Sequence, residues 1–326
     1  MRITFCTTQL GIAVSSALIL IAPAQAQPYP SRTVRILAGF APGGSTDIMA
    51  RIVAQKLTEA FQQQVVVENR PGANGNIAAE TTAKAPPDGY TLLMAANGFP
   101  INASLYKTLP YNPTRDFSPI TLFALIPNLL VVHPSLPVKS VRDMITLARG
   151  KPDQLTHGSS GTGSPGHLAG EVFKLMANVR FIHVAYKGSS QALIDLLGGH
   201  LQLAFPTIPA VMPYLKSGKL RALGVTSIKR SASLPEIATV AEAGVPGYEV
   251  VGWYGILAPA GVPRDIIVRL NGEITKALRL ADMQERLLRD GADPVGNTPD
   301  EFRAYVESDV VKWSKVIQAA GVRFEP

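Results

Sequence analysis

The first residues able to do chemistry lie in the segment Val34 to Asp47, which reads VRILAGFAPGGSTD. A short apolar run breaks there into glycines, and apolar residues with helical spacing follow at once. Gly43 and Gly44 allow a ligand to approach the main chain, and Ser45 or Thr46 can cap the helix. The unpaired N–H groups of the first helical turn would then point at the ligand. This order of residues predicts an anion-binding loop, and the alternative is an ordinary strand–turn–helix joint.

A second loop of the same kind follows at Gly158 to His167, GSSGTGSPGH. Its glycines have the G-x-G-x-x-G spacing of a dinucleotide-binding fingerprint, which requires an acidic residue about 20 residues later. The next predicted strand ends instead at Tyr186-Lys187-Gly188, so this interpretation is rejected. The loop offers hydroxyl groups to a carboxylate at the start of a helix, from Ser159, Ser160, Thr162 and Ser164. A second anion-binding loop is therefore predicted, with a merely structural turn as the alternative.

Neither loop contains Arg or Lys. We therefore expect a bound carboxylate to be held by N–H groups, hydroxyls and water, which avoids burying an unpaired cation when the site is empty. Asp47 is expected to support the dipole of its own helix, with contact to a ligand amine or hydroxyl as the alternative. Lys187 is placed at the rim of the site or on solvated surface. The net charge of +7 is scattered along the chain without a basic stripe, which argues against nucleic acid.

Catalytic motifs are missing from the sequence. It has no Gly-x-Ser-x-Gly elbow, His-Glu-x-x-His helix or Gly-Lys-[Ser/Thr] phosphate loop, and its histidines lack the spacing of metal ligands. We accordingly predict no enzyme activity and no metal. The alternative from another class is an exported serine hydrolase in which Ser164, His167 and Asp47 form a triad across the two loops. A structural or signalling domain is the third interpretation.

The first residues are typical of an export signal. Arg2 supplies the positive charge, residues 10–21 are apolar, and Ala24-Gln-Ala26 is a small-x-small cleavage site. We predict a signal peptide at residues 1–26, cleavage after Ala26 and an exported product. The single cysteine, Cys6, lies inside this segment, so thiolate catalysis and Cys-ligated metals are excluded from the mature chain.

Hydrophobic periodicity predicts a βαβαβ unit with strands at 33–37, 65–68 and 90–95 and helices at 48–61 and 77–84. Right-handed crossovers would put the first strand between the other two, with ligands at the carboxyl ends of the first and third strands. A second unit has predicted strands at 129–133, near 155, and at 181–186, 201–205 and 220–226, with helices between them.

Apolar extended residues at 246–255 could return the chain to the first unit, and the remainder is mostly helical. We therefore predict an α/β protein of two doubly wound lobes joined by a hinge. Lobe one is residues 27–126 plus 247–326, and lobe two is residues 127–246.

Six segments resemble one known family: FAPGGSTDIMAR (40–51), ENRPGANG (68–75), DGYTLL (88–93), SSGTGS with HL (159–168), AYKG (185–188) and WYGILAP (253–259). They are similar to the periplasmic receptors of tripartite tricarboxylate transporters, often called Bug proteins. The resemblance implies a periplasmic binding protein type II-like fold that closes around a small carboxylate. It also implies delivery to the membrane permease subunits of the transporter, without a cofactor, and we expect a monomer.

The resemblance also implies which residues contact the ligand. Carried onto the matching positions, they are Phe40, Gly43, Gly44, Ser45, Asp47, Asn97, Ser159, Thr162, Gly163 and Ser164. Tyr186 and Thr207 are expected as further wall residues. The identity of the carboxylate does not transfer from these motifs.

Overall fold

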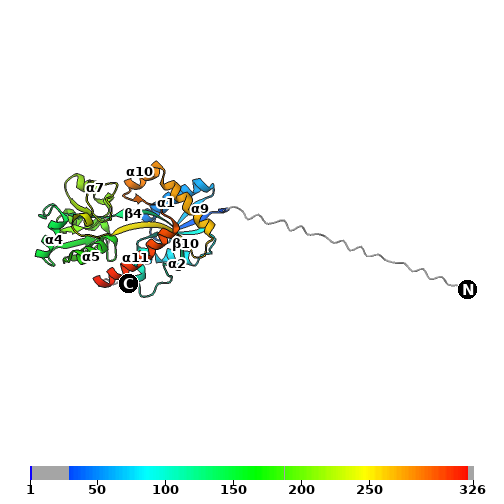
Figure 1. The fold of residues 1–326 in the computed structure, drawn as a ribbon, viewed down its shortest axis with the longest axis horizontal. Helices are drawn as coiled ribbons and strands as arrows, with labels where there is room; N and C mark the ends of the chain where they lie inside the picture. The colour runs from blue at the N-terminus through cyan, green and yellow to red at the C-terminus, as the bar shows by residue number, and fades with distance from the viewer. Residues whose placement is uncertain (2–28, 187, 322–326) are drawn as a thin grey trace.

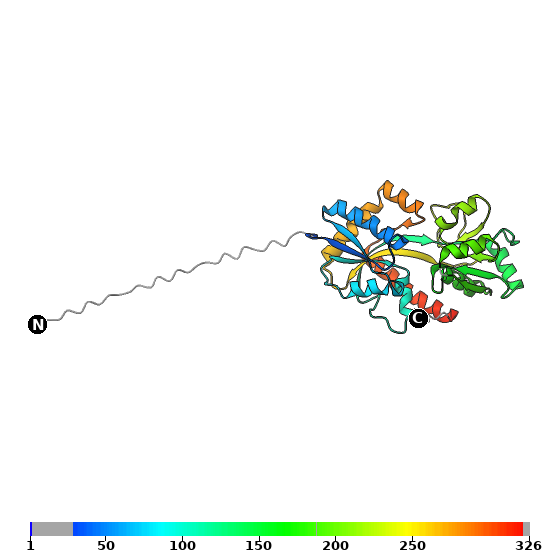
Figure 2. The ribbon, with the colours of Figure 1, turned by 180° about the vertical axis from the view of Figure 1, so that it is seen from behind.

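The computed structural model describes residue 1 and residues 29–186 and 188–321, in two bodies that lie side by side (Figures 1 and 2). Each body is built around its own β-sheet with helices packed against it. The fold is thus α/β and two-lobed, as the sequence predicts. Almost all of the predicted signal peptide falls outside the described residues. Within them, no helix combines the length and apolar character needed to cross a bilayer.

The first sheet has six strands in the order β2-β1-β3-β10-β4-β11. Their bounds are β1 Val34–Ala38, β2 Val65–Asn69, β3 Thr91–Ala96, β4 Phe117–Pro127, β10 Val251–Pro259 and β11 Asp293–Pro294. Strand β1 pairs in parallel with both β2 and β3, which confirms the predicted order. Strand β10 enters antiparallel between β3 and β4, so the returning chain completes this sheet.

Helices cover both faces of the first sheet because its strands are apolar on both sides. Along β1, Ile36 and Ala38 pack with α1 and α9, while Leu37 packs with the opposite layer of α2 and α11. The helices, with one 3-10 turn, are α1 Ser45–Phe61, η1 Ala73–Gly75, α2 Asn76–Ala83, α3 Gly98–Leu105, α9 Arg264–Leu278, α10 Ala281–Arg289 and α11 Pro299–Ala320.

The second sheet has five strands in the order β7-β6-β8-β5-β9. Their bounds are β5 Leu129–Val132, β6 Thr156–Ser159, β7 Ile182–Ala185, β8 Leu203–Ala204 and β9 Arg221–Val225. Strand β6 is parallel to both of its neighbours, whereas β5 is antiparallel to β8 and β9. The helices are α4 Val141–Gly150, α5 Pro165–Ala177, α6 Ser189–Leu197, α7 Ile208–Lys216 and α8 Val240–Ala243.

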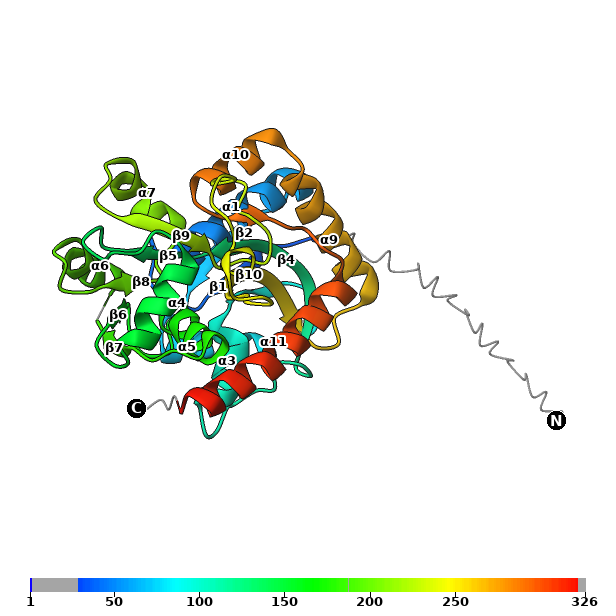
Figure 3. The same cartoon turned by 60° about the vertical axis from the view of Figure 1, so that its left-hand side comes forward.

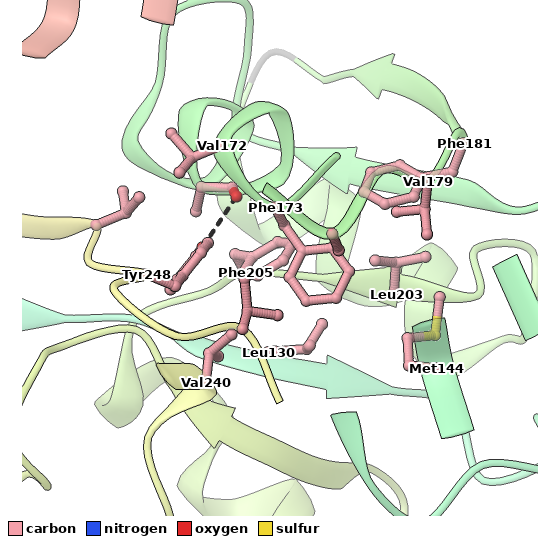
Figure 4. Packing of buried hydrophobic residues seen from close by; sticks show 14 of the residues in the cluster. Leu130, Met144, Val172, Phe173, Val179, Phe181, Leu203, Phe205, Val240 and Tyr248 are labelled. Carbon is pink, nitrogen blue, oxygen red and sulfur yellow. Dashed lines mark hydrogen bonds between the residues drawn. The ribbon is translucent and has the colours of Figure 1, made fainter. Parts of the chain in front are cut away.

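Aromatic side chains fill one face of the second sheet. Phe173 of α5 packs against Phe205 and Tyr248, and the Tyr248 hydroxyl donates a hydrogen bond to the Ala169 carbonyl at 2.9 Å (Figure 4). Tyr248 precedes β10, so this cluster joins the returning chain to the second sheet.

The chain crosses between the sheets twice, at adjacent places. The two crossing strands, β4 and β10, are paired antiparallel, with Val251 opposite Pro127. Beyond that pair, the Asn128 N–H donates to Thr226 Oγ1 at 2.8 Å and the Val250 N–H donates to the Thr226 carbonyl at 2.9 Å. The two connections are thus hydrogen-bonded to one segment, and a rotation of one sheet relative to the other would bend both at the same level.

A third link comes from α11, which packs on α3 and α5 (Figure 3). Trp313 and Ile317, near its end, belong to the same hydrophobic cluster as Phe173 and Phe205 of the second body. The helix begins with a capping box between Thr298 and Glu301. Its first turns therefore stabilise one body and its last turns contact the other.

Two elements have no counterpart in the predicted pattern. Strand β4 covers 11 residues, most of them buried. Because both of its faces are covered, its sequence shows no alternation of apolar and polar residues that would predict a strand. Helix α3 begins at Gly98, where the sequence predicts only the end of a strand and a ligand-binding turn. Tertiary packing decides both elements.

We predict that Trp313→Ala lowers the free energy of unfolding by about 3–5 kcal/mol, because a large side chain that is 1% exposed leaves a cavity in the shared cluster. Val311→Ala is the control on the same helix, since Val311 is 54% exposed, and it should change stability by less than about 0.5 kcal/mol. Urea denaturation of both variants checks this. Equal stabilities would contradict the bridging role of α11.

Candidate functional site

A cavity of about 670 Å³ lies between the two bodies, and both glycine-rich loops line it. From the first body it is lined by Phe40, Gly44, Ser45, Thr46, Ala73, Asn74, Ala96, Asn97, Gly98, Ile101, Leu105, Tyr106 and Tyr254. From the second it is lined by Ser160, Gly161, Thr162, Gly163, Ser164 and Pro165. All of these residues are uncharged, so the described lining offers main-chain groups, amides and hydroxyls to a ligand.

The first loop is held from behind by Asp47. Its carboxylate accepts hydrogen bonds from the Gly43 N–H at 2.9 Å, from Arg51 Nε at 2.9 Å and from Asn69 Nδ2 at 3.0 Å. Asn69 Nδ2 also donates to the Phe40 carbonyl at 3.0 Å. Burial on its own raises the pKa of Asp47, but these hydrogen bonds outweigh it and leave the pKa below its ordinary value. Asp47 is 2% exposed and positions the loop without lining the cavity.

Helix α1 presents its N-terminus to the cavity. Gly44 is the N-cap residue and provides no side-chain cap, while Gly44, Ser45 and Thr46 all line the cavity. The positive end of the helix dipole and the first-turn N–H groups are therefore placed beside the space that a ligand would fill. Burial raises the pKa of Tyr254, which lines the same space, and hydrogen bonding toward Thr46 and Ser45 opposes that effect.

The second loop is held by histidines. The Gly163 N–H donates to His167 Nδ1 at 3.0 Å, and Ser164 Oγ accepts from the His167 N–H at 3.3 Å as the cap of α5. Ser159 Oγ lies 2.7 Å from His183 Nε2 and accepts from the Gly161 N–H at 3.2 Å. Two glycine amides of this loop are therefore already paired, and so are the Ser159 hydroxyl and the Ser164 N–H, which donate to the Gly161 carbonyl at 3.0 and 3.2 Å. The hydroxyl groups of Thr162 and Ser164 can still donate to a ligand.

The same backbone turn and hydrogen bond recur in both loops. Gly43 has φ +79° and Gly163 has φ +77°, a left-handed conformation that favours glycine. Each donates its N–H to the side chain four residues further on, Asp47 in one loop and His167 in the other. The acceptor is a carboxylate in the first loop and an imidazole in the second, so the same backbone shape is fixed by different chemistry.

The imidazole rings of His167 and His183 are stacked, with centroids 3.8 Å apart and planes inclined by 17°. Because Nδ1 of His167 accepts a hydrogen bond, its proton is assigned to Nε2, which lies 3.5 Å from Glu171 Oε1. Burial lowers the pKa of His183 to about 4, with His167 adding to the effect. Hydrogen bonds from His167 and Lys174 outweigh burial and lower the pKa of Glu171 to about 2.

The hydrolytic triad is not assembled. The ring of His167 uses Nδ1 for Gly163 and directs Nε2 at Glu171, so neither nitrogen is placed to take a proton from Ser164. The carboxylate of Asp47 is occupied by Gly43, Arg51 and Asn69 instead of by His167. The hydrolase alternative is therefore wrong in the arrangement that the sequence suggested. Among the described residues, no group of three or more His, Cys, Asp or Glu side chains could hold a metal ion.

The structure brings most of the predicted ligand-binding residues to the cleft. Those that line the large cavity are Phe40, Gly44, Ser45, Asn97, Thr162, Gly163 and Ser164. Ser159 and Thr207 line an adjoining cavity of about 230 Å³. Gly43, Asp47 and Tyr186 line neither, and the Tyr186 hydroxyl donates to Asp195 Oδ2 at 2.5 Å. Lys187 lies outside the described residues. The ligand-contact role of each residue stays a prediction.

The sequence analysis did not identify several wall residues. Ile101 and Leu105 belong to α3 and Tyr106 directly follows it, and their apolar character gave no signal distinct from that of core residues. Asn74 has φ +54° within the turn between β2 and α2, a conformation that Asn tolerates. Its amide donates to Asn102 Oδ1 at 2.8 Å, so a buried polar network supports this side of the cleft.

The sequence of residues 49–322 matches the family described as tripartite tricarboxylate transporter family receptor. Protein BugT of Bordetella pertussis is 36% identical over the full length of both chains. The chain therefore belongs to this receptor family, as the six motifs predict.

Two solved structures extend the comparison. R. palustris Rpa4515 with adipate is 42% identical, with a TM-score of 0.76, and the alignment covers 90% of this chain and 99% of that one. MatC (Rpa3494) from Rhodopseudomonas palustris with bound malate is 30% identical, with a TM-score of 0.72, and the alignment covers 89% and 100%.

We predict that acidification destabilises the protein before its carboxylates protonate. Burial, together with the neighbouring histidines, lowers the pKa of His157 to about 3, and neither of its ring nitrogens has a hydrogen-bond partner within the described chain. A lowered histidine pKa means that the unfolded chain binds the proton first, so stability is present above pH 6.5 and falls below it.

His157→Leu should remove about 1.4 kcal/mol per pH unit from the slope of unfolding free energy between pH 6.5 and 4.5. Glu171, whose lowered pKa adds to the slope near pH 4.5 and below, and His183 are present in both proteins, so the difference in slope reports His157. The exposed His200, changed to Gln, is the control. Urea denaturation at several pH values measures the slope, and an unchanged slope in His157→Leu would refute the assignment.

Proposed function

We propose that this protein is a periplasmic receptor that captures a small carboxylate between two lobes and delivers it to the membrane permease of a tripartite tricarboxylate-type transporter. One observation carries the proposal. Two glycine-rich loops, each following the strand that lies between two parallel neighbours of its sheet, line a single uncharged cavity. We assign no catalytic residue, no cofactor and no metal to this site, and we propose that the protein acts as a monomer.

The carboxylate is held by dipoles instead of a cation. The N-terminus of α1 provides main-chain N–H groups at Ser45 and Thr46, and the opposite loop provides the hydroxyls of Thr162 and Ser164. Such groups stabilise an anion and leave no buried charge in the empty receptor. The adipate and malate of the two similar structures support a carboxylate as the ligand.

Capture follows from closure of the lobes, residues 27–126 plus 247–326 and residues 127–246. Both connections bend at the hydrogen-bonded segment of Asn128, Thr226 and Val250. A ligand favours the closed state only to the extent that it binds both loops at once. Removal of residues 1–26 after Ala26 releases the mature receptor into the periplasm.

We predict that Gly163→Val weakens carboxylate binding at least tenfold. The new side chain would sit at φ +77° with its Cβ 3.3 Å from Leu105 Cδ1, so it distorts the loop and crowds the cavity. Gly218→Val is the matched control, because Gly218 has φ +69°, open space around its Cβ and no place in the cleft.

Calorimetric titration with succinate, malate, adipate and citrate provides the measurement. For the acid that binds the unmodified protein most tightly, we expect Gly163→Val to lower the affinity at least tenfold. Gly218→Val should leave that affinity within twofold of the unmodified protein. If none of these acids binds the unmodified mature protein, the receptor proposal fails.

Ser164→Ala separates binding from hydrolysis. Loss of the α5 cap should lower the free energy of unfolding by about 1 kcal/mol. We expect no ester or amide turnover from either protein, so the substitution should leave hydrolysis at the buffer rate. Turnover that disappears in Ser164→Ala would restore the hydrolase interpretation.

A further inference from the structure

The adjoining cavity of about 230 Å³ is a side chamber of the cleft. It shares Ser45, Ser160 and Pro165 with the large cavity, and thus opens beside the N-termini of α1 and α5. Apart from Ser45, all of its lining residues fall between Asn128 and Ala210, in the second body. A ligand anchored between the two loops would therefore have one route into the second lobe.

The walls of the chamber are mainly apolar. Helix α6 contributes Ala192, Leu193 and Leu196, which fall on one face by helical spacing, and β8 with the residue after it contributes Ala204 and Phe205. The polar groups of the chamber are neutral, and Asn128 Nδ2 already donates to the Phe205 carbonyl at 2.6 Å. The apolar walls suit a hydrocarbon body, and the neutral hydroxyls of residues such as Ser189 and Thr207 can hydrogen-bond a polar group at its far end.

Small residues keep the chamber open. A Cβ on Gly158 would meet Leu201 Cδ1 at 2.2 Å, and a Cβ on Gly166 would meet the Phe205 carbonyl oxygen at 2.9 Å. Both glycines line the chamber; a Cβ on Gly158 would also lie 3.6 Å from Ala192 Cβ, so the backbones of β6 and α5 come close to the wall residues Ala192 and Phe205. Larger side chains here would shift the walls or fill the space.

The volume limits what can enter. An apolar cavity of about 150 Å³ is large enough to bind benzene. The chamber, at about 230 Å³, has room for one ring or a chain of about six carbons. A short hydroxy acid anchored between the loops has too few carbon atoms to fill the chamber.

We propose that the ligand is an elongated carboxylate, with its carboxylate between the two glycine loops and a hydrocarbon body of about six carbons in the side chamber. This inference rests on the proposed function, because the cleft supplies the anchor. The chamber supplies selectivity for length. Each methylene group buried there should improve the affinity about fourfold, up to the length that fills the space.

Chain-length series test the proposal. Butyrate, hexanoate and octanoate form one series, and succinate, adipate and suberate form a second that adds a distal carboxylate. Calorimetric titration of the mature protein should show affinity rising at least tenfold from four to six carbons in one series or both. The series with the steeper rise identifies the preferred distal group.

Ala210→Leu fills the chamber from the half-buried side of α7. We expect the six-carbon acid to bind at least tenfold more weakly, while the four-carbon acid changes by less than twofold. Ala60→Leu, at an exposed position near the other end of α1, is the matched control and should change neither. Leu193→Ala enlarges the chamber and should move the optimum to a longer acid, which keeps the test valid if Ala210→Leu fails to fold.

Two failures are distinguishable. If four-carbon and six-carbon acids bind equally and Ala210→Leu weakens both alike, the chamber proposal is wrong and the receptor function stands. If no acid of either series binds, and the acids of the receptor test do not bind either, the proposed function itself is wrong.

Discussion

The structure depends on one constraint: a main-chain loop that is to receive an anion without a cation has to be held rigid by groups behind it. Left-handed glycines at Gly43 and Gly163 turn the backbone, and each donates its N–H to a side chain four residues later. Asp47 and His167 are consequently buried and serve the loops instead of the ligand. The uncharged lining of the cleft is possible because the Asp47 carboxylate and the histidines stand in this supporting layer.

The two sheets place these loops at equivalent positions. Strand β1 has parallel neighbours on both sides, and so does β6. The helices that follow leave from the carboxyl ends of these strands, where α/β sheets bind ligands. The first strand after each crossing runs antiparallel to its neighbours, β10 in the first sheet and β5 in the second. Each body therefore contributes a similar half of the site.

The supporting layer differs between the lobes in its response to pH. Asp47 is ionised and stabilised by Arg51 and Asn69, whereas His157 is buried and His183 half-buried, both in neutral form. A buried carboxylate with three donors tolerates acid well below neutrality, and a buried neutral imidazole does not. The second loop is therefore the acid-sensitive half of the cleft. Its shape depends on the His167 and His183 stack, which no single-residue motif describes.

The sequence by itself determined the α/β class, the order of the first three strands and both glycine loops, because these follow from local periodicity, glycine and capping chemistry. It also determined the family, through six motifs in order. Only the tertiary structure decided that Asp47 faces its own loop, that β4 is a central strand and that α3 supplies Leu105 to the cleft. Those outcomes depend on which groups become buried together, and contacts between residues far apart along the chain leave no periodic signal in the sequence.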